Sequence, residues 1–235
     1  MTTEIYKTID EPFIAIIGIG NDSKRYIEEI SSWDFPQIIA GMQGQELSYP
    51  ESGIQMAILI VTDDTDAAVP AKSFKQADVL TVIVADREIT ADEDCYDSMT
   101  VVPKTAIPDT VRTITDIMIE PSAYTCLDLN DICYALRNSK NFSAFTLNAR
   151  ISNGGIEGLT SSLKEKLSMF PAFKKVLFKI TIAEEDRQSL KIEHISQLAD
   201  LFSAFPGNDR VIWGLNVSDK LNNDELRMSV LISNF

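Results

Sequence analysis

At 235 residues the chain is long enough for one large domain or two small ones, and 45% of its residues are hydrophobic, enough for a substantial core. The formal net charge of −14 opposes binding to nucleic acid or anionic lipid, and no stretch combines Lys and Arg with interleaved aromatic residues. The N-terminus does not read as a signal peptide and no apolar run could span a bilayer, so we expect a cytoplasmic protein without direct membrane insertion.

The first half of the sequence alternates strand and helix patterns. The apolar run Phe13–Ile17 ends in Gly18-Ile19-Gly20, which is typical of a strand buried on both faces of a parallel sheet. Asn21 or Asp22 is expected to cap a helix that extends to Ser32. A further helix is expected at Ala68–Gln76, and further strands at Gln37–Ala40, Met56–Val61, Val79–Ala85 and Met99–Val102. This alternation predicts an α/β fold with a mostly parallel sheet.

The second half predicts a smaller α+β domain. A helix begins near Pro108, and its apolar positions Val111, Ile114 and Ile117 recur at helical spacing. The following elements are expected to be a helix at Asn130–Asn138, a strand at Phe142–Ala149, a helix bearing Leu159, Leu163 and Leu167, a strand at Val176–Ile182 and a helix at Ile192–Phe202. The last two apolar runs, Val211–Val217 and Leu226–Ile232, are joined by polar turn residues and predict a closing hairpin.

The order of these elements resembles FtsZ, the bacterial relative of tubulin. Thr110–Met118 resembles the second half of the FtsZ core helix, Val176–Ile232 follows its C-terminal domain in order and spacing, and Phe13–Gly20 resembles its first strand and phosphate loop. The resemblance implies a Rossmann-like, mostly parallel sheet domain, a core helix and a smaller α+β domain. We place these at residues 1–106, 107–140 and 141–235.

The segment Leu127-Asp128-Leu129-Asn130-Asp131 is similar to the loop that follows the FtsZ core helix. In FtsZ, two acidic residues of this loop reach into the nucleotide pocket of the next subunit and help to activate the water that attacks GTP. The resemblance therefore implies that Asp128 and Asp131 are catalytic in trans, although Cys126 stands where FtsZ has an amide residue. On residue type alone, Asp131 would cap the following helix and Asp128 would form an Asx turn.

The sequence departs from FtsZ where the phosphates would bind. A phosphate loop uses glycines so that consecutive backbone N–H groups can turn toward anionic oxygens. FtsZ and tubulin have a GGGTGTG-type run, whereas Thr62–Ala68 has no glycine and carries Asp63, Asp64 and Asp66. These three carboxylates belong to a solvated loop or, alternatively, bind a divalent cation. Gly18 and Gly20 remain as candidate cofactor-binding residues, or they only allow a tight turn into the first helix.

The few cysteines and the single histidine do not predict a metal site. Cys95, Cys126 and Cys133 lack metal-ligand spacing, and their odd number argues against a disulfide scaffold. We interpret Cys126 and Cys133 as buried thiols, with reactive thiols as the alternative. His194 lies in a helical pattern without a nearby nucleophile signature, and we interpret it as structural.

These features together predict an FtsZ-like protein that lacks efficient GTP binding, needs no cofactor and acts by protein–protein contact, in bacterial cell division or filament modulation. The expected partner is FtsZ or another copy of this chain. One alternative is a divergent, self-assembling GTPase that binds GTP or GDP with Mg²⁺. Another is a module that binds an unrelated small molecule at the C-terminal ends of the first domain's strands.

Overall fold

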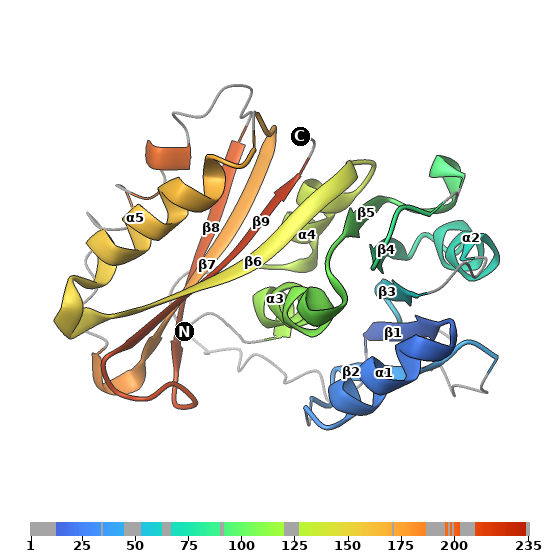
Figure 1. The fold of residues 1–235 in the computed structure, drawn as a ribbon, viewed down its shortest axis with the longest axis horizontal. Coiled ribbons are helices and arrows are strands. Elements are labelled where there is room, and N and C mark those ends of the chain that lie inside the picture. Colours follow the sequence, from blue (N-terminus) through green and yellow to red (C-terminus); the bar gives the residue numbers. More distant parts are fainter. Residues whose placement is uncertain are drawn as a thin grey trace, which may run out of the picture. The chain divides into compact units, whose positions relative to one another are not determined.

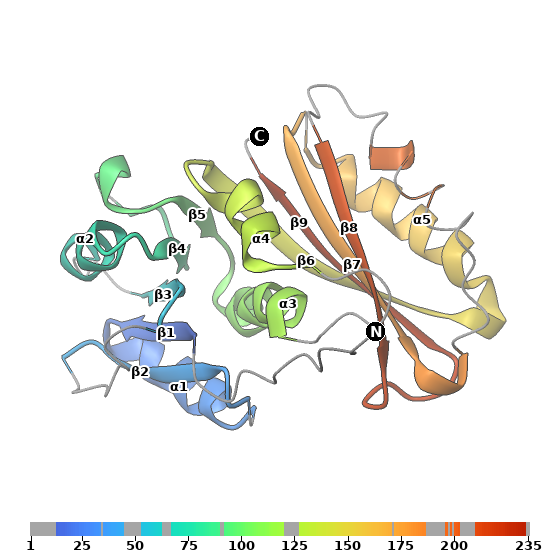
Figure 2. The same ribbon diagram turned by 180° about the vertical axis from the view of Figure 1, so that it is seen from behind.

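The computed structural model describes residues 13–33, 35–44, 53–62, 67–89, 92–119, 127–170, 172–186, 196, 198, 200–202 and 210–233. The chain divides into two compact units. The first comprises residues 1–97 and 101–108, and the second comprises residues 98–100 and 109–235. Figure 1 shows the strands and helices of both units, and Figure 2 shows the same chain from behind.

The first unit contains the parallel sheet that the sequence predicts. Its strands are β1 (Ile14–Ile19), β2 (Ile38–Met42), β3 (Met56–Val61) and β4 (Leu80–Ala85). They lie side by side in the order β2-β1-β3-β4, and all three pairings are parallel. Every residue of β1, β3 and β4 is buried, which explains why these strands appear in the sequence as unbroken apolar runs.

Short helices connect these strands. A 3₁₀ turn, η1 (Asn21–Ser23), leads directly into α1 (Lys24–Ser31), and α2 (Ala68–Gln76) precedes β4. The 3₁₀ turns η2 (Glu93–Cys95) and η3 (Lys104–Ala106) follow later in the unit. The expected cap by Asn21 or Asp22 is wrong, because Gly20 precedes the first turn and the Asp22 carboxylate accepts a hydrogen bond from Lys104 instead.

The second unit has a mixed sheet, and its strand order corrects the hairpin prediction. Its strands are β5 (Ser98–Val101), β6 (Lys140–Arg150), β7 (Lys175–Ala183), β8 (Arg210–Ser218) and β9 (Glu225–Ser233), in the order β5-β6-β9-β7-β8. Because β7 lies between β8 and β9, these last two strands do not pair. The almost wholly buried β7 takes the position between them, and β8, whose burial alternates, lies beyond it.

Helices cover both faces of this second sheet. They are α3 (Ile107–Ile119), α4 (Leu129–Leu136) and α5 (Gly155–Leu167), with 3₁₀ turns η4 (Ile151–Asn153) and η5 (Glu184–Asp186) at strand ends. Figures 1 and 2 show α5 on one face and α4 on the other. A hydrophobic core lies under α5, where Leu159, Leu163 and Leu167 pack with alternate residues of β7 and β9.

The remaining sequence-based expectations fall partly inside the described residues. Of the expected helix at Ile192–Phe202, only residues 196, 198 and 200–202 are described, all helical, and the Phe202 ring stacks on Phe178 at 5.0 Å between centroids. Cys126 and His194 lie outside the described residues, whereas Cys95 is buried and Cys133 half-buried. In the part of the chain that the structure describes, no helix is both long and apolar enough to cross a membrane.

Candidate functional site

The candidate site lies at the carboxyl edge of the first unit's sheet. The chain leaves β1 toward β2 on one side, while β3 lies on the other side of β1. Open α/β sheets bind ligands at such a switch point, outside the carboxyl ends of the strands, because the loops there diverge. The ends of β1, β3 and β4 and the start of η3 therefore supply the residues to be considered.

The turn after β1 depends on both of its glycines. A Cβ atom added to Gly18 would lie 2.7 Å from Ser23 Oγ and 2.8 Å from both Ile27 Cγ1 and Met42 Sδ. Gly20 has φ 91° and ψ 156°, a conformation that is essentially restricted to glycine. The Ser23 hydroxyl donates to the Gly20 carbonyl oxygen at 2.5 Å. The structure therefore explains both glycines by packing and turn geometry, without reference to a ligand.

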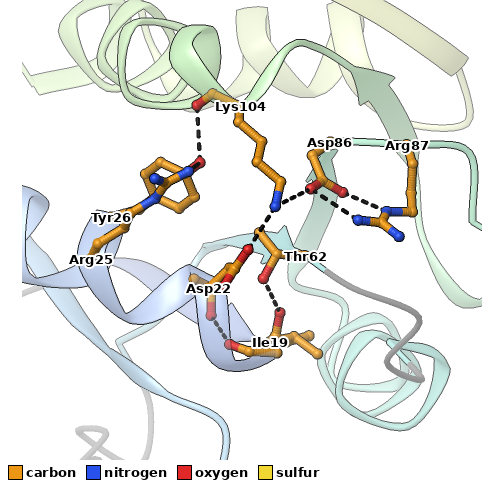
Figure 3. A network of polar contacts seen from close by, with 10 residues as sticks. Ile19, Asp22, Arg25, Tyr26, Thr62, Asp86, Arg87 and Lys104 are labelled. Carbon is orange, nitrogen blue, oxygen red and sulfur yellow. Dashed lines mark hydrogen bonds and ion pairs between the residues drawn. The ribbon is translucent and has the colours of Figure 1, made fainter.

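An ion network connects the turn after β1, the end of β4 and the start of η3, as Figure 3 shows. Lys104 Nζ lies 2.6 Å from Asp22 Oδ2 and 3.4 Å from Asp86 Oδ2. Arg87 Nε donates to the other oxygen of Asp86, Oδ1, at 2.9 Å. The Tyr26 hydroxyl donates to the Lys104 carbonyl oxygen at 3.0 Å, which ties η3 to α1. Two carboxylates and two cations thus neutralise one another at this edge.

The members of the network differ in exposure. The Asp86 side chain is only 2% exposed, whereas those of Lys104 and Asp22 are 40% and 50% exposed. The hydrogen bond from Arg87 is the main cause that lowers the pKa of Asp86, and the hydrogen bond from Lys104 lowers the pKa of Asp22. The same bond raises the pKa of Lys104. All three charges are therefore stabilised by their neighbours.

Asp22 occupies a position that favours an anion. It lies in the first turn after Gly20, where unpaired backbone N–H groups at a helix N-terminus attract negative charge. It is also the closest carboxylate to Lys104 in the network. The chain therefore supplies, from its own side chain, the negative charge that a bound anion would bring to such an edge.

The loop after β3 begins beside the turn after β1. The Thr62 backbone N–H donates to the Ile19 carbonyl oxygen at 3.0 Å, and its hydroxyl donates to the same oxygen at 3.3 Å (Figure 3). Asp63, Asp64 and Asp66 follow, but they lie outside the described residues. Among the described residues, no group of His, Cys, Asp or Glu side chains is arranged to hold a metal ion.

Asp128 and Asp131 lie in the second unit and form a capping box. Asp128 is the N-cap of α4, and its Oδ1 accepts a hydrogen bond from the Asp131 backbone N–H at 3.1 Å. Asp131 Oδ2 in turn accepts from the Asp128 backbone N–H at 3.1 Å. The pair therefore stabilises the start of α4. The expectation from residue type that Asp131 caps this helix is wrong, because the N-cap is Asp128 and Asp131 is the third helical residue, which completes the capping box. Their catalytic role in trans stays a prediction.

Sequence reasoning missed Lys104, Asp86 and Arg87. They are distant in sequence from Asp22, and no motif connects them. A usable signal was present, however, because Asp86-Arg87 directly follows a buried parallel strand. Since the carboxyl ends of parallel strands meet at one edge of a sheet, charged residues at such positions are expected to lie close together.

No protein-family model matches the sequence, and no curated protein matches it. Solved structures, however, resemble the fold. An empty FtsZ dimer from M. jannaschii matches with a TM-score of 0.69 over 95% of this chain and 88% of that chain, at 13% identity. GDP-bound monomeric CetZ1 from Haloferax volcanii matches with a TM-score of 0.69 over 94% of each chain, at 10% identity.

The chain has an FtsZ/tubulin-like fold. A GDP-form TubZ protofilament structure from Bacillus thuringiensis serovar israelensis agrees, with a TM-score of 0.67 over 95% of this chain and 86% of that chain, at 9% identity. These matches confirm the expected α/β fold class. Within the FtsZ-like fold, the turn after β1 and the loop after β3 are the two positions that the sequence resemblance assigned to phosphate binding.

Proposed function

We propose that this is an FtsZ-like protein that does not bind GTP efficiently and acts by protein–protein contact, in bacterial cell division or in the modulation of a filament. The observation that carries the proposal is the pairing of Lys104 with Asp22 and Asp86 at the carboxyl edge of the first unit. The charged residues at this edge neutralise one another without a bound ligand.

The charged groups at this edge do not fit a triphosphate. A phosphate group near Lys104 would meet the Asp22 and Asp86 carboxylates, which already share that cation. Two like charges about 4 Å apart repel each other by about 1 to 4 kcal/mol, depending on the effective dielectric. The adjoining sequence adds Asp63, Asp64 and Asp66 and no glycine between Thr62 and Ala68. These features argue against tight binding of a polyanion.

Calorimetry with GTP and GDP in the presence of Mg²⁺ tests this proposal directly. We expect no saturable binding to the wild-type protein. A dissociation constant of about 1 μM, which corresponds to about −8.2 kcal/mol, would overturn the proposal. Asp22→Asn is the informative variant, because it keeps the size of the side chain and removes one of the repelling charges. Detectable binding by this variant alone would identify Asp22 as the group that excludes the nucleotide.

A divergent GTPase is the second candidate, and the exposure of the network favours it. Lys104 and Asp22 are both about half accessible to solvent, so an incoming anion can reach the lysine. This candidate requires saturable GTP binding that is weakened at least tenfold by Lys104→Gln. If the wild type and Lys104→Gln bind GTP equally well, any nucleotide lies away from this edge, and the divergent-GTPase candidate is contradicted.

Protein–protein contact is supported by the assemblies of the similar structures, which include an FtsZ dimer and TubZ protofilaments. We propose that Asp128 and Asp131 face a neighbouring subunit, which would be FtsZ or another copy of this chain. The test is the GTP turnover and sedimentation of FtsZ with and without this protein. Asp128→Asn with Asp131→Asn removes both charges, and asparagine still caps a helix well. The proposal is supported if the wild-type protein changes the GTP turnover or sedimentation of FtsZ and a normally folded double variant does not. It is contradicted if the wild-type protein associates neither with FtsZ nor with other copies of itself.

A further inference from the structure

One edge of the second unit's sheet collects positive charge. Because β9 is antiparallel to both β6 and β7, and β8 is parallel to β7, the strands β6, β7 and β8 all begin at the same edge. Figure 1 shows these starts together at the upper end of the sheet. Five cations lie at or next to these starts and the end of α4, a group that we call the basic edge: Arg137, Lys140, Lys174, Lys175 and Arg210.

The basic edge contrasts with the charge of the whole chain. The formal net charge of the chain is −14. The described segments that form the edge, residues 134–142, 172–177, 210–212 and 231–233, contain no Asp or Glu. Asp209, which directly precedes Arg210, lies outside the described residues. Cations that gather on one part of an acidic protein produce a local positive field, which favours an anionic partner there.

Part of the basic edge is organised around the half-buried ring of Tyr134 in α4. Lys175 Nζ lies 5.3 Å from the centroid of this ring, and Arg210 Cζ lies 5.2 Å from it. Lys175 Nζ also donates to Ser139 Oγ at 3.0 Å. Cations at such distances from an aromatic face are attracted to the ring. Two of the charges are therefore held in place, and Arg210 and the neighbouring Lys174 are exposed to a partner.

The strand register arranges these cations as a row. Lys175 and Arg210 are register partners on neighbouring parallel strands. Ser233 of β9 is the register partner of Lys175 on one side and of Phe142 on the other, and Phe142 lies two residues after Lys140. Since the strand order is β6-β9-β7-β8, the row spans three inter-strand spacings, about 14 Å at ~4.8 Å each.

We propose that the basic edge binds an acidic segment of a partner protein, in an extended conformation and with carboxylates at alternate positions. Alternate side chains of an extended chain point to the same face and lie about 6.8 Å apart, at ~3.4 Å per residue. Carboxylates at the first, third and fifth positions of such a segment therefore span about 14 Å, which is the length of the row. One short segment can thus pair with cations from all three strand starts.

Size and charge favour a short acidic segment over other anions. A single phosphate group is much shorter than the row and would meet only neighbouring cations. A nucleic acid or an anionic membrane extends far beyond the edge, where it meets the acidic remainder of the chain. Exposed charges are screened beyond about 8 Å at physiological ionic strength, so a short segment interacts mainly with the basic edge itself.

Fluorescence anisotropy with labelled synthetic peptides tests the proposal. The first peptide has three glutamates at alternate positions, separated by serine. The second has the same three glutamates in one contiguous block, and the third has serine throughout. At about 50 mM salt, where screening is weak, we expect saturable binding of the alternating peptide, weaker binding of the contiguous peptide and no binding of the serine peptide.

Two charge-reversed proteins locate the binding site. Lys174→Glu with Arg210→Glu changes two exposed cations of the basic edge. Each lost attraction becomes a repulsion, so the alternating peptide should bind about tenfold more weakly. Lys24→Glu with Lys72→Glu is the matched control, because it changes the net charge equally at exposed helix positions in the first unit. The control protein should bind the peptide as the wild type does, and circular dichroism checks that both proteins fold.

The proposal is overturned if the wild type does not bind the alternating peptide, if it binds both acidic peptides equally, or if the control protein loses as much binding as the edge variant. Tighter binding of inorganic phosphate, single-stranded DNA or phosphatidylglycerol vesicles than of the peptide, weakened by the edge variant, would assign the edge to a different partner and also overturn it. So would self-association that this variant abolishes. The inference uses neither the Lys104 network nor Asp128 and Asp131, so it and the proposed function can fail separately.

Discussion

Replacement of Gly18 by alanine tests the interpretation that this residue serves packing and not a ligand. The added Cβ would lie 2.7 Å from Ser23 Oγ and 2.8 Å from Ile27 Cγ1 and Met42 Sδ. Carbon atoms pack favourably at about 3.5 to 4.0 Å, so all three neighbours would have to move. The change therefore crowds the contact of β1 with α1 and β2, without altering any charge at the edge.

The size of the effect depends on which neighbour can move. Ser23 is fully buried and its hydroxyl is bonded to Gly20, so it is fixed, whereas the Met42 side chain is flexible. Overpacking by a methyl group typically costs about 1 to 3 kcal/mol, and burial of the added carbon returns about 0.8 kcal/mol. The difference is about 0.2 to 2.2 kcal/mol, and because the fixed Ser23 cannot move aside, we expect the upper part of this range: Gly18→Ala should lower the free energy of unfolding of the first unit by about 1 to 2 kcal/mol.

Urea unfolding followed by tryptophan fluorescence measures this loss in each unit separately. Trp33 lies in the first unit and Trp213 in the second, so Trp213→Phe and Trp33→Phe backgrounds each report one unit. Gly158→Ala is the control, because its Cβ would meet only the Asn153 carbonyl oxygen at 3.9 Å. In a helix interior this change should stabilise by about 0.5 to 1 kcal/mol. If Gly18→Ala lowers the free energy of unfolding by less than about 0.5 kcal/mol, as most surface substitutions do, the packing argument is refuted.

Three further substitutions probe other parts of the structure. Asp128→Ala should destabilise the second unit by about 1 kcal/mol in urea unfolding, because α4 loses its N-cap, whereas Asp128→Asn should cost only a few tenths. Lys179→Met should cost about 1 to 3 kcal/mol in the same assay, because the buried lysine donates to the Asp116 carbonyl oxygen at 2.7 Å. Asp86→Asn should flatten the dependence of the first unit's stability on acid pH. The lowered pKa of Asp86 provides stability that is present above the unfolded value of about 3.9 and is lost as pH falls through the folded pKa.

Each of these substitutions has an outcome that contradicts its premise. Equal stability of Asp128→Ala and Asp128→Asn would mean that the capping box contributes nothing to α4. A more stable Lys179→Met protein would show that the buried charge costs more than its hydrogen bond returns. An Asp86→Asn protein whose stability falls between pH 7 and pH 3 as steeply as that of the wild type would exclude Asp86 as a source of acid sensitivity.

The sequence predicts the strands of the first unit well because burial alone determines them. Each of β1, β3 and β4 is buried along its whole length, so its apolar run starts and stops close to the strand itself. Strand β2 is mostly half-buried, and its predicted bounds, Gln37–Ala40, differ from the observed Ile38–Met42 by one residue at the start and two at the end. Local composition therefore locates a strand best where both of its faces are covered.

Strand pairing is harder to predict, as the last two strands show. The turn between β8 and β9 has hairpin composition, but pairing of β9 with β7 on one side and β6 on the other satisfies both edges of a largely buried strand. These partners lie far away in sequence. Turn residues show that the chain reverses, whereas the choice of neighbour depends on the burial of strands elsewhere in the unit.

The ion network was not predictable residue by residue, because its members act only in combination. Asp22 looks like a helix cap, Lys104 looks like a solvated charge after Pro103, and Asp86-Arg87 looks like a polar strand end. Parallel topology brings these positions to one edge, where Lys104 selects Asp22 and Asp86 as partners.

Because Asp22 and Asp86 already neutralise Lys104, the folded protein should not depend on a bound nucleotide for its stability. A ligand that binds only the folded protein stabilises it by about 4.1 kcal/mol at 1,000 times its dissociation constant. If GTP bound with a dissociation constant of about 1 μM, 1 mM GTP would therefore raise the midpoint of thermal unfolding by more than about 10 °C, since ~1 kcal/mol shifts a unit of this size by about 4 to 8 °C. We expect no shift with GTP and Mg²⁺ beyond that produced by Mg²⁺ and an equal ionic strength of sulfate. A GTP-specific rise would mean that phosphate displaces Asp22 from Lys104, and the Asp22→Asn protein should then show a still larger rise.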